Sequence, residues 1–213
     1  MASNPTIFHN RALRWEELCG REAAVGEGRL NLIRLFAILP FYAYHLINFY
    51  WIDPGSIELA FHIQVSALVL AWSCEVVLLY YWGRRRWLMH PQVQYMAVGW
   101  DIIMISVLLM LCQRPAGALV MLYLLVIASS SMRLSLTCVY FATLACVAGY
   151  LFALGQYVFF DVGYLAYYAT PELRLSRNEQ IQVILTILAT GFVAGQVVRQ
   201  AKRLAQSFAA RED

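Results

Sequence analysis

LAFHIQVSALVLAWSCEVVLLYYW, residues 59–82, decides the fold class, because this apolar run is long enough to cross a lipid bilayer as one helix. A hydrocarbon core of about 30 Å needs roughly 20 helical residues. The run contains a single carboxylate, Glu75, and ends on the interface aromatics Tyr80, Tyr81 and Trp82. The same composition extends over the whole chain of 213 residues, of which 61% are hydrophobic and only 14% are charged. The sequence therefore predicts a membrane protein built from helices.

Six apolar segments follow one another along the chain, and we predict that each is a transmembrane helix. The predicted spans are Ile33–Trp51, Leu59–Trp82, Val93–Cys112, Ala116–Ser129, Leu134–Phe160 and Ile181–Val198. The fourth segment is short and poorly bounded, so five spans is the competing count. The predicted fold class is an all-α polytopic membrane helix bundle. Its parts are a cytoplasmic N-terminal segment at 1–29, a six-helix transmembrane domain at 30–198 and a cytoplasmic connector helix at 199–213.

Basic residues gather on one side of the predicted bundle. With six spans, that side receives Arg11, Arg14, Arg21, Arg29, Arg34, Arg84, Arg85, Arg86, Arg133, Arg199, Lys202 and Arg203. The opposite side receives Arg114, Arg174 and Arg177 together with several acidic residues. Because loops rich in Arg and Lys stay in the cytoplasm, this distribution predicts that both termini are cytoplasmic.

Two carboxylates, Glu75 and Asp101, fall inside the predicted spans. They are equally distant along the chain from the turn at 86–90, so we expect them at one depth in the membrane. A charge at that depth is costly and normally faces the bundle interior or water. Arg34, at the inner end of the first span, has a side chain long enough to reach either acid. Two interpretations stay open: a proton, cation or polar-ligand site, or neutral acids that hold the helices together by hydrogen bonds.

A candidate ligand pocket lies in the outer half of the first two spans, where polar and aromatic residues gather: Tyr42, Tyr44, His45, Asn48 and His62. A small ligand from outside or from the outer leaflet would find polar contacts there, whereas the alternative is the ordinary aromatic belt of a membrane interface. Pairing the two spans offsets the histidines by about three residues, or ~4.5 Å along the axis, which disfavours a haem held by both. We therefore predict no cofactor and no metal site.

The last span continues into GFVAGQVVRQAKRLAQSFAARED, residues 191–213, without a glycine or proline after Gly195. Gly191 and Gly195 form a GxxxG pair, which allows helix backbones to approach closely. The four-three-four spacing of a coiled-coil seam follows, at Val197, Ala201, Leu204 and Phe208. We predict a homodimer that uses these residues. The alternative is packing within one chain, followed by a solvated basic tail.

Catalytic signatures are missing from the sequence, which contains no metalloprotease, hydrolase, phosphate-loop, dinucleotide, kinase or cyclase motif. Its basic residues are spread over short loops and do not form one face, which disfavours nucleic-acid binding. We therefore expect that the protein is not an enzyme and does not bind nucleic acid.

Four segments give the chain a wider resemblance: GEGRLNLIRLFAILPFYAYHLINFY, FHIQVSALVLAW, SMRLSLTCVYFATLACVAGYLF and GFVAGQVVRQAKRLAQSF. Together they resemble the six-helix N-terminal input modules of bacterial membrane-bound signalling enzymes of the histidine kinase or class III nucleotide cyclase type. The resemblance rests on helix count, orientation, arginine-rich helix starts and the exit helix. The output domain of that family does not follow Asp213, so the connector would act on a further domain or on a separate partner.

The resemblance implies a membrane sensor or receptor in the bacterial cytoplasmic (inner) membrane. It would relay a stimulus through its last helix to a cytoplasmic signalling output domain or partner. Two alternatives come from other classes: a small ion or proton channel or transporter that uses Glu75 and Asp101, and a subunit of a membrane redox or other multi-protein complex. The lipid bilayer is a partner in every case.

Overall fold

Residues 28–52, 58–84, 91–112, 118–170 and 175–209 are described by the structure, a computed structural model, and the secondary structure in these ranges is entirely helical. The N-terminal span (Gly28–Ile52) ends in the π-helical turn η1 (Asn48–Ile52). It is followed by α2 (Leu59–Arg84), α3 (Pro91–Leu111), η3 (Ala118–Val120), α4 (Met121–Ser130), η4 (Ser131–Arg133), α5 (Leu136–Gln156), η5 (Tyr157–Asp161), α6 (Tyr164–Ala169) and α7 (Arg177–Ala209). The all-α class is confirmed. Nearly all of the predicted N-terminal cytoplasmic segment lies outside the described residues.

Within the described ranges, five helices are long and apolar enough to cross a bilayer: Gly28–Ile52, Leu59–Tyr81, Gln92–Leu111, Leu136–Asp161 and Arg177–Ser207. The described part of the predicted fourth span, from Ala118 to Ser129, instead lies in η3 and the short helix α4, which continues into η4. α4 itself has 10 residues, and with the two flanking turns the helical stretch rises about 27 Å, slightly less than a hydrocarbon core of ~30 Å. The count of six full spans is therefore not confirmed, although an apolar helix is present at this position.

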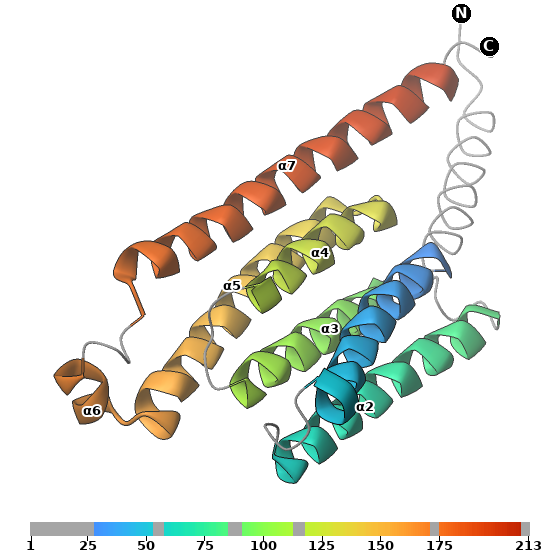
Figure 1. The fold of residues 1–213 in the computed structure, drawn as a ribbon. Helices are drawn as coiled ribbons and strands as arrows, with labels where there is room; N and C mark the ends of the chain where they lie inside the picture. Colours follow the sequence, from blue (N-terminus) through green and yellow to red (C-terminus); the bar gives the residue numbers. More distant parts are fainter. Residues whose placement is uncertain (1–27, 53–57, 85–90, 113–117, 171–174, 210–213) are drawn as a thin grey trace, which may run out of the picture.

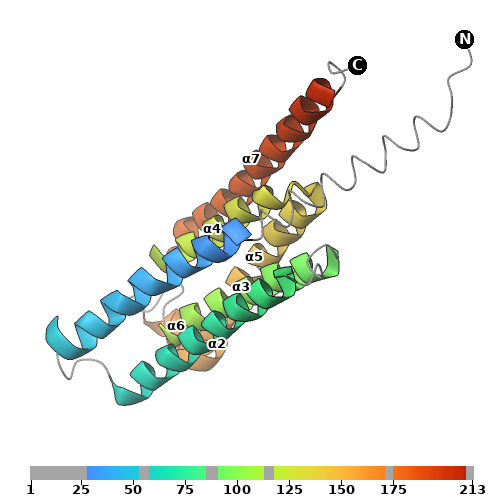
Figure 2. The same cartoon turned by 90° about the vertical axis from the view of Figure 1, so that its right-hand side faces the viewer.

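α4 nevertheless carries the chain back from one end of the bundle to the other. Figures 1 and 2 show α4 antiparallel to both α3 and α5. As a result, the start of the N-terminal span and the end of α7 lie at the same end of the bundle. An odd number of helices would place these two ends at opposite ends of the bundle. α4 is the additional helix that brings them to the same end.

Side-chain hydroxyls at the end of α4 form hydrogen bonds with the backbone carbonyls of the same helix. The hydroxyls of Ser129, Ser130 and Ser131 each donate to the carbonyl three residues earlier, at 2.9, 2.7 and 2.6 Å. The Ala128 carbonyl also accepts a bond from the Ser131 amide, so the hydroxyls add a second donor near the end of α4, where lipid would supply none. Leu134 then adopts a left-handed conformation with φ of 52°, and Ser135 caps the start of α5 by accepting from the Cys138 amide. The serine cluster thus has a structural use.

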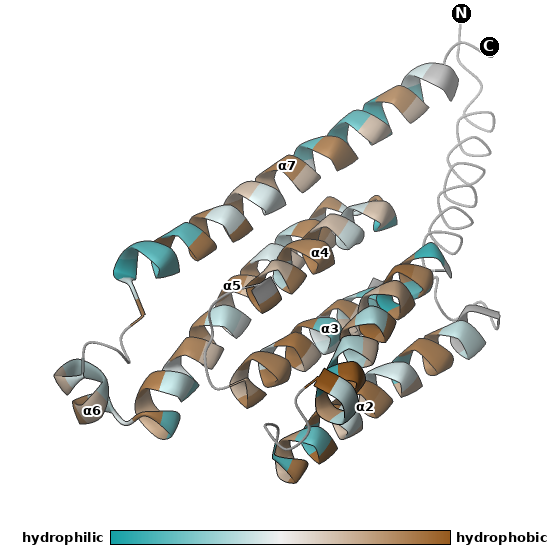
Figure 3. Cartoon of the chain, viewed as in Figure 1, coloured by the Kyte–Doolittle hydropathy of each residue, from teal (hydrophilic) through white to brown (hydrophobic). Residues whose placement is uncertain are grey.

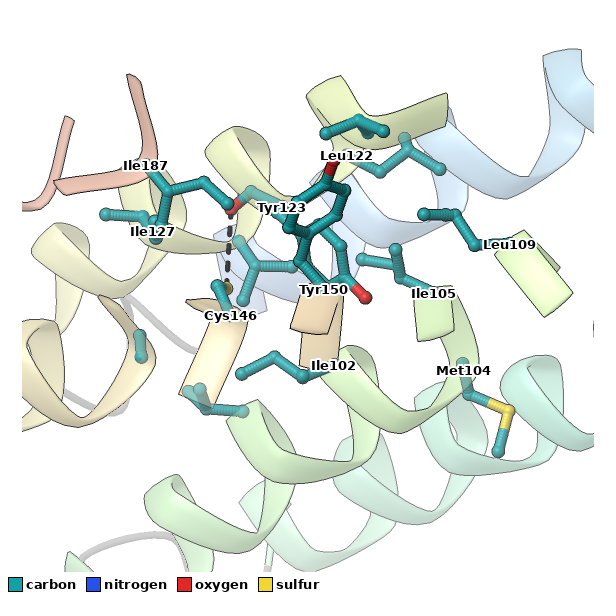
Figure 4. Packing of buried hydrophobic residues seen from close by; sticks show 14 of the residues in the cluster. Ile102, Met104, Ile105, Leu109, Leu122, Tyr123, Ile127, Cys146, Tyr150 and Ile187 are labelled. Carbon is teal, nitrogen blue, oxygen red and sulfur yellow. Dashed lines mark hydrogen bonds between the residues drawn. The ribbon is translucent and has the colours of Figure 1, made fainter. Parts of the chain in front are cut away.

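The core of the bundle is built around α5, which packs against α3, α4 and α7. Figure 4 shows Tyr123 among the aliphatic side chains of this core, and Tyr123 is fully buried. Its hydroxyl lies 2.8 Å from Ser106 Oγ, and Ser106 in turn donates to the Ile102 carbonyl at 2.7 Å. A Cβ at Gly149 would lie 2.7 Å from that same Ser106 oxygen. The small residue on α5 is therefore required for its close approach to α3.

The outer faces of the helices are apolar, as expected for contact with lipid. Figure 3 shows hydrophobic residues over most of the bundle, with hydrophilic residues concentrated near the two ends of α7. Large side chains such as Phe36 and Phe192 are 70% and 63% exposed. A water-soluble protein rarely leaves so much apolar surface uncovered. This surface agrees with a multi-pass membrane protein.

α7 packs onto α5 through the two glycines of its GxxxG pair. A Cβ at Gly191 would overlap the Thr143 side chain, and one at Gly195 would lie 3.5 Å from Tyr140. The Thr143 hydroxyl donates to the Val139 carbonyl at 2.8 Å, which fixes its position. The close contact predicted for this pair is therefore made within one chain in this structure. A dimer contact would need another face of α7.

We predict that Gly191→Ala destabilises the bundle, because the added methyl group cannot be accommodated beside Thr143. Overpacking of this kind costs about 1–3 kcal/mol. Gly99→Ala is the matched control, since a Cβ at Gly99 meets nothing within 4 Å. Unfolding titrations in mixed detergent micelles measure both. Equal effects of the two substitutions would contradict the close contact between α5 and α7.

Candidate functional site

A buried ion pair joins the N-terminal span to α3. Arg34 Nε lies 2.9 Å from both carboxylate oxygens of Asp101, and Arg34 Nη2 donates to Asp101 Oδ2 at 2.7 Å. The two side chains are 8% and 6% exposed. A forked contact between a guanidinium and a carboxylate is the strongest geometry available to such a pair. The pairing of Arg34 with an intramembrane acid, considered from the sequence, is thus present with Asp101.

Two further side chains complete the polar cluster. Arg34 Nη1 donates to Asn31 Oδ1 at 2.8 Å, and Trp72 Nε1 donates to Asp101 Oδ1 at 3.0 Å. The cluster therefore draws on the N-terminal span, α2 and α3 together. Burial of two charges is tolerated only where additional hydrogen bonds satisfy them, and Asn31 and Trp72 supply these bonds. Sequence reasoning missed both residues, although Asn31 precedes Arg34 by one helical turn.

Glu75 is also buried, on the same face of α2 as Trp72 and one turn further along. Three residues correspond to about 4.5 Å of helix rise, so Glu75 lies within one turn of the level of Asp101. This agrees with the expectation that both acids share a similar depth. Glu75 lines a second cavity of about 430 Å³ between α2 and α3, with Met96 and Trp100 among its neighbours.

The predicted ligand pocket corresponds to a cavity of about 380 Å³ between the N-terminal span and α2, closed on the third side by α3, η3 and α4. Tyr42, Tyr44, His45 and Asn48 line this ligand cavity, as four of the five predicted residues. The remaining lining is almost wholly aliphatic and aromatic. Such a cavity is large enough for a small organic ligand and suits an apolar one with few polar atoms.

The fifth predicted residue, His62, lies directly beside this cavity. His62 Nδ1 is 3.1 Å from His45 Nε2, and its ring stacks on Phe49 with the centroids 4.0 Å apart. Two imidazoles on opposite faces of one metal would have nitrogens about 4 Å apart, twice the usual metal–nitrogen distance. The histidines instead bond to each other. Within the described ranges, no three His, Cys, Asp or Glu side chains are grouped closely enough to hold a metal ion.

Trp72 connects the ligand cavity to the ion pair. Its ring lines the cavity, while its indole N–H donates to Asp101. A ligand that displaces this ring therefore perturbs a hydrogen bond to the carboxylate that holds Arg34. The N-terminal span is sensitive to such a change, because only 17% of its most apolar window is buried, against 44% for Gln92–Leu111.

The predicted pairing seam begins while α7 is still packed against α5, since Val198 beside it is fully buried. Val197 and Leu204 are 53% and 59% exposed and Ala201 is half-buried, whereas the side chain of Phe208 lies outside the described part. Arg199 Nη2 donates to the Tyr140 hydroxyl at 3.0 Å, which ties this part of α7 to the start of α5. α7 is continuous for 33 residues, so the predicted unbroken exit helix is confirmed as far as Ala209.

Comparison with protein-family models, with curated proteins and with solved structures finds no match.

We predict that Asp101→Asn destabilises the protein by about 3–5 kcal/mol, the usual cost of leaving one partner of a buried pair without its counter-charge. The double variant Arg34→Met/Asp101→Leu removes both charges and should recover a large part of this loss. The free energies of unfolding of Arg34→Met, Asp101→Leu and the double variant give the coupling between the two residues. Additive effects would contradict a direct, buried ion pair.

Proposed function

We propose that this protein is a membrane sensor, which detects a small apolar ligand in its ligand cavity and relays its presence to the cytoplasm through α7. The observation that carries the proposal is the position of Trp72. This one side chain lines the cavity and also donates a hydrogen bond to the Arg34–Asp101 ion pair. Binding and helix position are thereby linked through one residue.

The relay needs a ligand that binds two arrangements of the helices with different affinity. Displacement of Trp72 weakens one support of Asp101, so it favours an arrangement in which the N-terminal span sits differently on α3. Contiguous contacts lead onward from there. Ser106 on α3 bonds to Tyr123 on α4, and α5 packs closely onto α7 at Gly191. These packed helices offer a physical route for the signal.

The output in this proposal is the cytoplasmic end of α7. A homodimer would form along the exposed face that contains Val197 and Leu204, because the two glycines already face α5. The proposed protein crosses a bacterial inner membrane six times and has both termini in the cytoplasm. The common end shared by the start of the N-terminal span and the end of α7 supports an even number of crossings.

A channel or transporter is the second candidate, and the cavity beside Glu75 favours it. A buried carboxyl that lines a space of about 430 Å³ is a suitable stepping point for a proton or cation. Asp101 is less suited to this role, because its oxygens already accept bonds from Arg34 and Trp72.

For the sensor, we predict that single cysteines introduced at 197, 201, 204 and 208 cross-link between copies in a heptad pattern in native membranes. A cysteine at 198 should react little, because Val198 is fully buried within the chain. The native cysteines are first replaced, by alanine in the core and by serine elsewhere. A flat profile along α7 would contradict the dimeric relay.

The link to the ligand cavity is tested in the same cross-linking assay. Ala37→Phe fills part of the cavity, and we expect it to change the cross-linking rate at position 204 at least threefold. Ala60→Phe is the control, because Ala60 is exposed and does not line the cavity. Equal cross-linking rates in the parent, Ala37→Phe and Ala60→Phe proteins would show that the cavity does not influence the dimer contact of α7.

For the transporter, we predict that Glu75→Gln abolishes proton or cation flux in proteoliposomes, because the amide cannot exchange a proton or carry a charge. Thr186→Ala on the exposed face of α7 serves as a control for the effect of mutation alone. Flux that is unchanged by Glu75→Gln would remove this acid from any transport path.

A further inference from the structure

A third cavity, larger than the other two, lies between the end of α5, the short helix α6 and the start of α7. Its volume is about 720 Å³. Figure 1 shows α6 beside the end of α5, at the end of the bundle opposite the exit of α7. This tyrosine-lined cavity, with Tyr164, Tyr167 and Tyr168 on its wall, shares no residue with the ligand cavity described above.

The lining of the tyrosine-lined cavity changes character along its length. Leu151, Leu154 and Val158 contribute an apolar wall on α5 and η5, whereas Ser176, Arg177 and Gln180 contribute a polar rim at the start of α7. Because α5 runs toward this end of the bundle, the leucines lie deeper in the membrane than the polar rim. An apolar depth below a polar rim matches the order of an acyl chain below a headgroup.

The polar rim is held in place before any ligand arrives. Tyr167 is 6% exposed, and its hydroxyl accepts from the Leu175 amide at 3.1 Å and from Gln180 Nε2 at 3.4 Å. Gln180 also donates to the Leu175 carbonyl at 3.3 Å. The ring of Tyr157 packs edge-on against Tyr167 from η5, with the centroids 6.2 Å apart. Such pre-organisation lowers the entropy that binding must overcome.

The charge of the lining indicates the ligand. Among the described residues that line this cavity, Arg177 is the one charged side chain, whereas Glu179, in the same helical turn, does not line it. A guanidinium matches the geometry of a phosphate, to which it can donate two parallel hydrogen bonds. Half-exposed tyrosines such as Tyr164 and Tyr168 suit the headgroup level of a bilayer, where one side of the ring is apolar and the other is wet.

We propose that this cavity binds one anionic phospholipid, with its phosphate on Arg177 and one acyl chain along Leu151 and Leu154. The bound lipid would join α5, α6 and the start of α7 at the end of the bundle remote from the output. This site is independent of the proposed sensor, because it uses neither the ligand cavity nor the ion pair.

The full-length protein in detergent is titrated with phosphatidylglycerol, with phosphatidylcholine of the same chains, and with inorganic phosphate. We expect native mass spectrometry to show one retained phosphatidylglycerol, and thermal unfolding to shift upward with this lipid only. Arg177→Gln should weaken retention about tenfold, the loss of roughly one charge-assisted hydrogen bond. Arg199→Gln, at the other end of α7, should leave it unchanged. Equal retention of both lipids, stabilisation by phosphate alone, or equal effects of the two arginine variants would overturn the proposal.

A second variant fills the cavity without changing the charge of Arg177, and so tests whether the lipid needs this space. Gly155 lines the cavity, and a Cβ built there meets nothing within 4 Å. Gly155→Leu should therefore fold at least as well as the parent, because leucine favours a helix over glycine, yet it should lose the retained lipid. Gly99→Leu is the matched control on α3. Full lipid retention by Gly155→Leu would overturn the site, whatever the outcome of the cross-linking experiments.

Discussion

The buried contact between Arg34 and Asp101 is the constraint on which the rest of the structure depends. A charge inside a membrane span is tolerated only beside its counter-charge, so the N-terminal span has little freedom of rotation about α3. The register that this pair sets brings Asn31 and Trp72 into the same cluster. It also leaves the ligand cavity between the N-terminal span and α2. One electrostatic requirement therefore positions the helix that is otherwise least buried.

Local sequence was sufficient to predict the elements whose causes are local. The apolar runs form helices, and the exit helix is unbroken to Ala209. Tyr42, Tyr44, His45 and Asn48 line one cavity because they lie within about two turns of one helix. The long side chain of Arg34, at the inner end of the first span, predicts that it can reach an intramembrane acid, and it contacts Asp101. The count of six full spans is not confirmed, because the fourth apolar segment forms α4, which is shorter than the other apolar helices. Its shortness is already visible in the sequence, where five spans is the competing count.

The sequence also could not show which residues on different helices pack against each other. The GxxxG pair on α7 indicated a close helix contact, but a pattern on one helix does not name the helix that fills it, and Thr143 on α5 has no distinctive signal of its own. Trp72 appeared as one aromatic residue in an apolar run, whereas its role depends on Asp101 from another helix. The tyrosine-lined cavity likewise requires three elements to meet, which no single segment of the sequence encodes.

The shortness of α4 has a consequence for the membrane itself. Together with η3 and η4 it forms a helical stretch over Ala118–Arg133 that rises about 27 Å, a little less than a hydrocarbon core of ~30 Å. A lipid that contacts its exposed residue Met121 would therefore meet an apolar surface slightly shorter than the bilayer. Hydrophobic mismatch of this kind is relieved by local thinning, at a cost of a fraction of a kcal/mol per ångström. The free energy of this side of the bundle therefore depends on the thickness of the surrounding bilayer.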